Sequence, residues 1–244
     1  MMARAWHLMS RPQGLPTNEN FALKELDLPP LAAGQVRVRN QWLSVDPYMR
    51  GRMNDVKSYV PPFQIDQPME GGAVGEVVES TAEGFTPGDR VLHMGGWRDE
   101  AVLDARTVNK LPDLGTEPQA FLGNLGVTGA TAYFGLLEVA SAKPGDIVFV
   151  SAAAGAVGSA VVQIAKAKGM TVIGSAGGAD KCDFVQSLGA DQVVDYKAQP
   201  ILKGLAGAAP EGIDVYFDNV GGDHLDAAFA LARMRARFGD REAC

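Results

Sequence analysis

The amino-acid sequence predicts an α/β protein in which a β-rich region precedes a parallel sheet with helices on both faces. Three observations support this fold class. Short runs alternate apolar and polar residues up to about residue 115, and apolar runs recur at roughly 20-residue intervals after it, with helical patterns between them. Repeated β-α units of this kind give parallel strands joined by right-handed crossovers.

Length and composition are consistent with a globular fold. The chain has 244 residues, of which 46% are hydrophobic and 21% charged, so it is not disordered and has room for one large or two medium domains. The net charge is −7 and the pI is about 5.0. Such a chain lacks the basic surface of a nucleic-acid-binding protein and the polybasic patch of a membrane-associated one.

Cysteine and histidine usage limits the metal chemistry. The two cysteines, Cys182 and Cys244, cannot form a disulfide framework and favour a reducing, cytoplasmic compartment. The three histidines, His7, His93 and His224, have no partner at metal-ligand spacing. We therefore expect packing histidines and no metal site.

Two uncharged stretches, 118–137 and 147–165, are long enough to span a membrane, but their composition is not that of a membrane helix. Glycines and polar side chains interrupt both, so we expect buried elements of a soluble fold. The first eleven residues contain no apolar core of a secretory signal.

The first half contains short strand patterns. Residues 35–40 alternate with period two, and 75–79 and 89–93 are further strand candidates, the last introduced by a turn at 86–89. Proline pairs at 29–30 and 61–62 mark loops. These features predict a small barrel or sandwich.

The second half alternates strands and helices. A turn at 143–146 precedes a buried strand at 147–150 and a helix from about 155 to 168. Later strands are predicted at 171–173, 192–194 and 213–217, with helices at 181–188, 201–206 and 225–232. We expect four parallel strands and then an abrupt end.

The turn after the first of these strands fits G-x-G-x-x-G with Ala153 at the first glycine. Gly155 would let the backbone approach a pyrophosphate, and Gly158 would let the helix pack tightly on the strand. The helix N-terminus would present free N–H groups to the phosphates. The alternative is a close-packed turn without a ligand.

The end of the second parallel strand bears on cofactor choice. Sites that prefer NAD usually carry an acid about 20 residues past the loop, but residues 174–178 contain none. Small residues leave room for a 2′-phosphate, which Lys181 can bind, so the sequence favours NADP. The alternative is that Lys181 is an ordinary solvated helix residue.

At these residues the chain resembles a known family, the zinc-independent NADP-dependent members of the medium-chain dehydrogenase/reductase superfamily. The similarity is to the alkenal/one oxidoreductases and prostaglandin (leukotriene B4 12-hydroxydehydrogenase-type) reductases. It spans residue 3 to about residue 238 and is carried by four segments together: 44–53, 126–133, 152–158 and 216–222. It implies a GroES-like β-rich substrate domain at 1–117 and a Rossmann NADP-binding domain at 118–244.

The resemblance also implies an activity and the residues that carry it. Family members use NADPH to reduce the carbon–carbon double bond of enals and enones, and full-length relatives are homodimers. The residues implied are Gly155, Ala156, Val157 and Gly158 at the pyrophosphate, Lys181 and Tyr196 at the 2′-phosphate, Asn219 near the cofactor, Thr128 near the nicotinamide, and Tyr48 facing the substrate.

Three of these residues could instead have purely structural roles. Tyr48 could be a packing tyrosine, Tyr196 an ordinary aromatic after a strand, and Asn219 part of a turn. A tyrosine and the nicotinamide ribose hydroxyl are the hydrogen-bond donors that the family's chemistry implies for the enolate oxygen.

The C-terminus departs from the family pattern. Residues 235–238 begin like a fifth strand, but the charged hexapeptide 239–244 follows. We expect that no apolar strand forms there, that the chain ends prematurely, and that 213–217 becomes an exposed sheet edge. Two hypotheses follow: an NADPH-dependent reductase of α,β-unsaturated carbonyls, or a catalytically inactive fragment that at most binds NADP.

Overall fold

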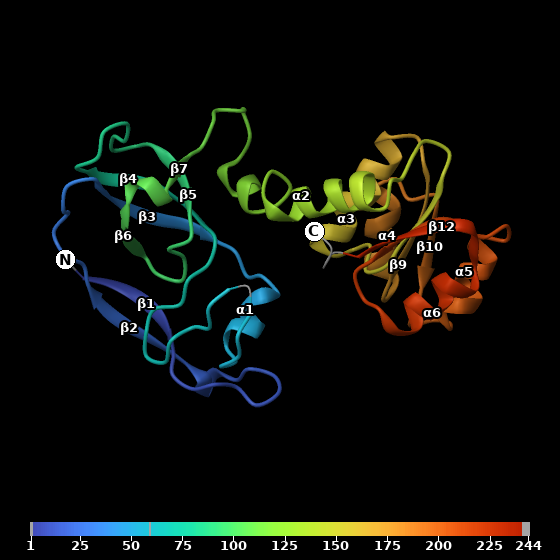
Figure 1. The fold of residues 1–244 in the computed structure, drawn as a ribbon, viewed down its shortest axis with the longest axis horizontal. Coiled ribbons are helices and arrows are strands. Elements are labelled where there is room, and N and C mark those ends of the chain that lie inside the picture. The colour runs from blue at the N-terminus through green and yellow to red at the C-terminus, as the bar shows by residue number, and fades with distance from the viewer. Residues whose placement is uncertain (1, 59, 241–244) are drawn as a thin grey trace. The chain divides into compact units, whose positions relative to one another are not determined.

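The computed structural model describes residues 2–58 and 60–240, arranged in two compact units, Met1–Leu122 and Gly123–Cys244 (Figure 1). The first unit consists mainly of antiparallel strands, and in the second unit parallel strands alternate with helices. This mixed architecture confirms the predicted fold class.

The first unit contains two antiparallel sheets. One pairs β1 (Met2–Leu8) with β2 (Phe21–Asp27). The other has the strand order β6-β3-β4-β5-β7. Its strands are β3 (Gln35–Leu43), β4 (Ala73–Ser80), β5 (Arg90–His93), β6 (Glu100–Asp104) and β7 (Asn109–Lys110).

The period-two pattern found in the sequence reflects burial on one face of this second sheet. Val36 and Val38 of β3 are fully buried, and they pack with Val77 and Val91 of the neighbouring strands. The predicted strands at 35–40, 75–79 and 89–93 therefore all form. Strands β1, β2, β6 and β7 were not predicted. Strands β6 and β7 are short, β2 carries three charged residues, and the inward-facing side chains of β1 include the small Ala3 and Ala5, which give a weak apolar pattern.

The second unit is a five-stranded parallel sheet in the order β10-β9-β8-β11-β12. The strands are β8 (Ile147–Val150), β9 (Thr171–Ala176), β10 (Gln192–Asp195), β11 (Ile213–Asp218) and β12 (Ala232–Asp240). The helices are α2 (Val127–Phe134), continued by the π-helical turn η4 (Gly135–Val139), α3 (Ala156–Ala167), α4 (Ala179–Ser187), α5 (Ile201–Ala208) and α6 (Gly222–Ala230).

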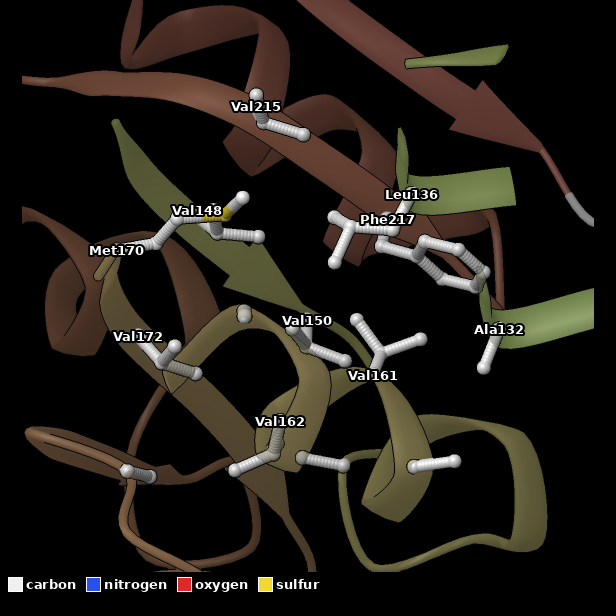
Figure 2. Packing of buried hydrophobic residues seen from close by; sticks show 14 of the residues in the cluster. Ala132, Leu136, Val148, Val150, Val161, Val162, Met170, Val172, Val215 and Phe217 are labelled. Carbon is white, nitrogen blue, oxygen red and sulfur yellow. The ribbon is translucent and has the colours of Figure 1, made fainter. Parts of the chain in front are cut away.

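Alternate side chains of the central strands enter two separate cores. Figure 2 shows Val148, Val150 and Phe217 of β8 and β11 facing side chains of α2, η4 and α3, among them Leu136 and Val161. Their sequence neighbours Phe149 and Tyr216 join the other core, with residues of α5 and α6. Helices thus cover both faces of the sheet. The uncharged stretch 147–165 is mostly buried, as expected, but 118–137 is not, because Val127 and Phe134 are exposed. None of the helices in residues 2–58 and 60–240 combines the length and apolarity needed to cross a bilayer.

The fifth strand corrects one prediction. We expected residues after 238 to be unable to continue a strand, leaving 213–217 at the edge of the sheet. Instead β12 extends through Asp240 and pairs in parallel with β11, so β11 is an interior strand.

The charged composition of β12 is compatible with a strand because the pairing uses the backbone and only a few side chains need apolar neighbours. Phe238 stacks on Phe229 with ring centroids 4.6 Å apart and meets Tyr216 edge-on at 5.9 Å. Arg237 donates to the buried Asp146 carboxylate at 2.7 Å. Residues 241–244 of the predicted charged hexapeptide lie outside the described part of the chain.

Candidate functional site

The candidate site lies in the second unit, at the carboxyl ends of β8 and β11. The chain proceeds from β8 outward to β9 and β10, and then returns to the other side of β8 with β11. Ligands of open α/β sheets bind in the crevice outside the strand ends at such a reversal of strand order.

The turn between β8 and α3 forms the centre of this site. Gly155 is the N-cap of α3, in an extended conformation with φ −77° and ψ 171°, and no side chain caps the helix. The first backbone N–H groups of the 12-residue helix α3 are therefore left for an external acceptor, which the helix dipole makes favourable for an anion.

Gly158 is required by packing within the same turn. A side-chain carbon at this position would collide with the carbonyl oxygen of Ala152 and the backbone of Ala153. A carbon on Gly155, in contrast, would meet only the Ala152 oxygen, at 3.1 Å. The two glycines thus have the two different roles expected from the sequence, close helix packing for Gly158 and an open approach to the backbone for Gly155.

The replacement of the first glycine by Ala153 is accommodated by the neighbouring strand. Ala153 is fully buried, and its N–H donates to the carbonyl of Ser175 at 2.9 Å. Opposite it lies Gly174, where a side-chain carbon would come within 2.9 Å of the Ala153 methyl. Glycine at position 174 therefore leaves the space that the Ala153 methyl group occupies. The preceding Ala152 adopts the left-handed region with φ 47°, a strained conformation for alanine.

Two segments meet near the position that the resemblance implies for a 2′-phosphate: Gly177–Gly178 between β9 and α4, and Asp195–Lys197 at the end of β10. The Asp195 carboxylate accepts from the N–H groups of Gly178 and Lys197 at 3.0 and 2.9 Å, which holds the pKa of Asp195 below its ordinary value. The Tyr196 hydroxyl lies over Gly177, 2.6 Å from where a side-chain carbon of that residue would stand. Lys181 is exposed in the first turn of α4. The structure thus brings the Gly177 turn and Tyr196 together, and Lys181 follows Gly178 by three residues.

Asn219 is linked directly to the turn after β8. Its backbone N–H donates to the Ser151 hydroxyl at 2.8 Å, and its side-chain amide donates to the Ser151 carbonyl at 2.9 Å. Since Ser151 immediately precedes the Ala152–Gly158 segment, the two turns at the strand-order reversal are joined. Sequence reasoning missed Ser151, Tyr216 and Asp218, which form a hydrogen-bonded cluster beside Asn219.

Two further predicted residues, Thr128 and Tyr48, belong to other elements. Thr128 is half-buried in the first turn of α2, and α2 packs against α3. The residue after it, Gly129, lies against the backbone of Asn124. Tyr48 belongs to the first unit. It begins the short helix α1 (Tyr48–Arg52) and packs on an apolar cluster that includes Met49 and Phe63.

Arg52 secures that helix. Its guanidinium donates to the Glu70 carboxylate at 3.0 Å and to the Pro61 carbonyl at 2.8 Å. It also lies 4.1 Å from the centroid of the Phe63 ring. A largely buried arginine with these partners fixes α1, and with it the backbone of Tyr48, within the first unit.

The histidines pack in the protein interior. His7, His93 and His224 are all buried. Burial, and to a lesser degree the charge of Arg98, lowers the pKa of His93 to about 4, so this ring is neutral near pH 7. Among the residues that the structure describes, no group of three or more His, Cys, Asp or Glu side chains could hold a metal ion.

Comparisons with known proteins place the chain among oxidoreductases. A family model described as the N-terminal domain of oxidoreductase matches residues 4–111, and one described as zinc-binding dehydrogenase matches residues 156–239. The chain is 46% identical over 235 residues to NADPH-dependent curcumin reductase of Escherichia coli (strain K12), which covers 96% of this chain and 68% of that protein. It is 42% identical over 248 residues to prostaglandin reductase 1 of Oryctolagus cuniculus, with 99% and 68% covered.

Solved structures agree with these similarities. The crystal structure of CurA in complex with NADPH from Vibrio vulnificus superposes with a TM-score of 0.90 at 46% identity, over 96% of this chain and 70% of that one. The chain thus spans about two thirds of the length of these relatives.

Proposed function

The chain belongs to the zinc-independent, NADP-dependent oxidoreductases of the medium-chain dehydrogenase/reductase superfamily, of the alkenal/one reductase type, and we propose that it reduces the carbon–carbon double bond of α,β-unsaturated aldehydes and ketones. The observation that carries the proposal is the uncapped N-terminus of α3 at the strand-order reversal, with Gly155 open and Gly158 packed. This backbone arrangement suits the pyrophosphate of a dinucleotide.

The residues of the second unit divide between two parts of the cofactor. The backbone of Gly155, Ala156, Val157 and Gly158 would hold the pyrophosphate, and Asn219 and Thr128 would lie toward the nicotinamide. Strand β9 and Gly177–Gly178 contain no acid to hold a ribose 2′-hydroxyl, whereas Lys181 of α4 and Tyr196 after β10 are exposed. That combination supports NADP in preference to NAD.

For this reduction the protein must position the cofactor and the substrate and donate one hydrogen bond to the substrate. When bound, NADPH supplies the hydride that adds to the β-carbon of the substrate. The charge that develops on the carbonyl oxygen then needs a donor, and we assign this role to the Tyr48 hydroxyl. The helix α1 that carries Tyr48 is held by Arg52, so the hydroxyl has a fixed support within its own unit.

Two measurements on the purified 244-residue chain test this function. The first is binding of NADP and NAD by titration calorimetry, where we expect NADP to bind at least about tenfold more tightly, because a charged hydrogen bond contributes roughly 1.5–3 kcal/mol. The second is oxidation of NADPH in the presence of methyl vinyl ketone, with its saturated counterpart butanone as the control substrate. We expect oxidation only with the unsaturated ketone.

A matched pair of variants isolates the role of Tyr48. Loss of a principal hydrogen-bond donor to a developing oxyanion lowers kcat by roughly 10²–10³. Because the resemblance implies that the nicotinamide ribose hydroxyl shares this role, we expect Tyr48→Phe to lower kcat by about ten- to hundredfold, with NADP affinity unchanged. Tyr133→Phe, on the partly exposed surface of α2, should leave both unchanged. NADP binding without any turnover would reject the reductase and support the inactive binding protein instead.

A further inference from the structure

We propose that Ser151, Tyr216 and Asp218 are positioning residues that fix the carboxamide of Asn219 and lock the β8–α3 and β11–α6 turns in one arrangement for cofactor binding. The inference rests on the proposed function, because it takes Asn219 to contact the cofactor. All three residues lie at or next to the carboxyl ends of β8 and β11, where the strand order reverses.

The orientation of Asn219 is set by a single neighbour. Ser151 accepts from the backbone N–H of Asn219 with its hydroxyl and from the Asn219 side-chain amide with its carbonyl. Because the amide nitrogen of the planar carboxamide faces Ser151, the oxygen Oδ1 at its other end faces away. Asn219 is therefore held as an acceptor for a donor group of the cofactor, such as a hydroxyl or a carboxamide N–H.

Asp218 holds the segment that follows Asn219. One carboxylate oxygen accepts from the N–H groups of Val220 and Gly221 at 2.9 and 2.7 Å, which closes the turn before α6. Gly221 and Gly222 have φ angles of 71° and 52°, a backbone conformation that glycine adopts without strain. Burial raises the pKa of Asp218, but these N–H groups and the nearby hydroxyls outweigh it, so the pKa of Asp218 lies below its ordinary value.

Tyr216 links Asp218 to Ser151. Its hydroxyl donates to the same Asp218 oxygen at 2.7 Å and lies 3.1 Å from the Ser151 hydroxyl oxygen. The ring is fully buried, stacked on Phe149 at 5.1 Å with an interplanar angle of 16°. A phenylalanine at position 216 would fill the same space in the core. The hydroxyl is therefore not needed for packing, and its hydrogen bonds connect the two turns at the strand ends. The cluster thus joins one strand end to the other through side chains 65 residues or more apart in sequence.

The first experiment measures both cofactors on the Tyr216→Phe chain. Loss of one hydrogen bond in a shared positioning cluster should weaken NADPH and NADH binding alike, by about three- to tenfold, leaving their ratio unchanged. A structural change confined to the 2′-phosphate site would alter the ratio instead. Tyr133→Phe is the matched control and should bind both cofactors as the unaltered chain does.

The second experiment reports on Asn219 without any cofactor. In the ¹H–¹⁵N spectrum, the side-chain NH₂ resonances of Asn219, assigned by their loss in Asn219→Asp, should shift in Tyr216→Phe and stay in place in Tyr133→Phe. Asp218→Asn keeps an acceptor oxygen and should bind NADPH within about threefold of the unaltered chain, whereas Asp218→Ala should lose about tenfold or more. The comparison of Asp218→Asn with Asp218→Ala therefore tests the inference even if Tyr216→Phe folds poorly.

The outcomes separate the inference from the proposed function. If the unaltered chain binds neither cofactor, the proposed function fails, and the Asn219 resonances in the free protein still test the positioning cluster. If Tyr216→Phe binds both cofactors normally and leaves those resonances in place, the inference is wrong. A changed NADPH-to-NADH ratio in Tyr216→Phe would also contradict it.

Discussion

The two turns that follow β8 and β9 lie at the same edge of one sheet but are built differently. The β8–α3 turn is a closely packed backbone segment, in which Gly158 lies against Ala152 and Ala153. The β9–α4 turn is open and polar: Gly178 donates its N–H to Asp195 at the end of β10, and Lys181 of α4 and Tyr196 after β10 are exposed.

The difference separates two properties of a dinucleotide site. A backbone cradle binds the pyrophosphate, which NAD and NADP share, while side-chain charge and hydroxyl groups distinguish the 2′-phosphate, which only NADP has. Substitutions in the first turn should therefore change affinity for both cofactors, and substitutions in the second should change the preference between them.

The largest effect is expected at Gly158. Its substitution by alanine forces a methyl group onto the Ala152 carbonyl, and overpacking of this kind costs about 1–3 kcal/mol of stability or more. We expect Gly158→Ala to lose NADP binding and to lower the thermal unfolding midpoint of the second unit, followed by circular dichroism. All three tryptophans, Trp6, Trp42 and Trp97, belong to the first unit, so tryptophan fluorescence should show that unit unchanged.

Gly155 provides the matched comparison within the same turn. With φ −77°, Gly155→Ala needs the Ala152 oxygen, 3.1 Å from the new carbon, to move by only a few tenths of an ångström, so it should destabilise the unit less than Gly158→Ala. The methyl group would nevertheless stand where a phosphate approaches, so NADP and NAD affinity should both fall by about tenfold. Unchanged affinity in Gly155→Ala would mean that the pyrophosphate binds elsewhere.

The next effect concerns cofactor preference. Lys181→Gln should weaken NADP binding by about ten- to hundredfold, the equivalent of roughly 1.5–3 kcal/mol for a charged hydrogen bond, and leave NAD binding unchanged. The loss should shrink as salt is added, because an exposed charge pair is screened. Titration calorimetry with both cofactors measures the preference directly.

Lys203→Gln on α5 removes the same charge from another exposed position and should leave the preference as it is. Equal weakening of NADP and NAD by Lys181→Gln would contradict the assignment of Lys181 to the 2′-phosphate.

Most elements of the second unit could be predicted because their signal is local. The apolar run 147–150 and the glycines after it define β8 and the start of α3. Strand β12 was missed because it carries Arg233, Arg235 and Arg237 in place of an apolar run, and its stability comes from pairing with β11 and from ion pairs such as that of Arg233 with Asp214 at 3.0 Å. These partners are distant in sequence, so no local pattern reveals them.

The residues of the candidate site also differ in whether a local sequence pattern could predict them. Gly155 and Gly158 follow from their spacing, since the geometry of one turn dictates both. The cluster of Ser151, Tyr216 and Asp218 depends on the register of β8 and β11, in which Tyr216 lies beside Phe149. The only sequence signal was polar side chains within or directly after buried strands, which does not reveal which of them meet.

The smallest expected effect is that of the Tyr196 hydroxyl. Tyr196→Phe keeps the ring in its edge-on contact with His224, at a centroid distance of 5.2 Å, and removes only the hydroxyl over Gly177. A single neutral hydrogen bond contributes about 0.5–1.5 kcal/mol, so NADP affinity should fall by about two- to tenfold with NAD affinity and the unfolding midpoint unchanged. If NAD binding weakened equally, Tyr196 would support the turn as a whole, and selection of the 2′-phosphate in the open turn would rest on Lys181 alone.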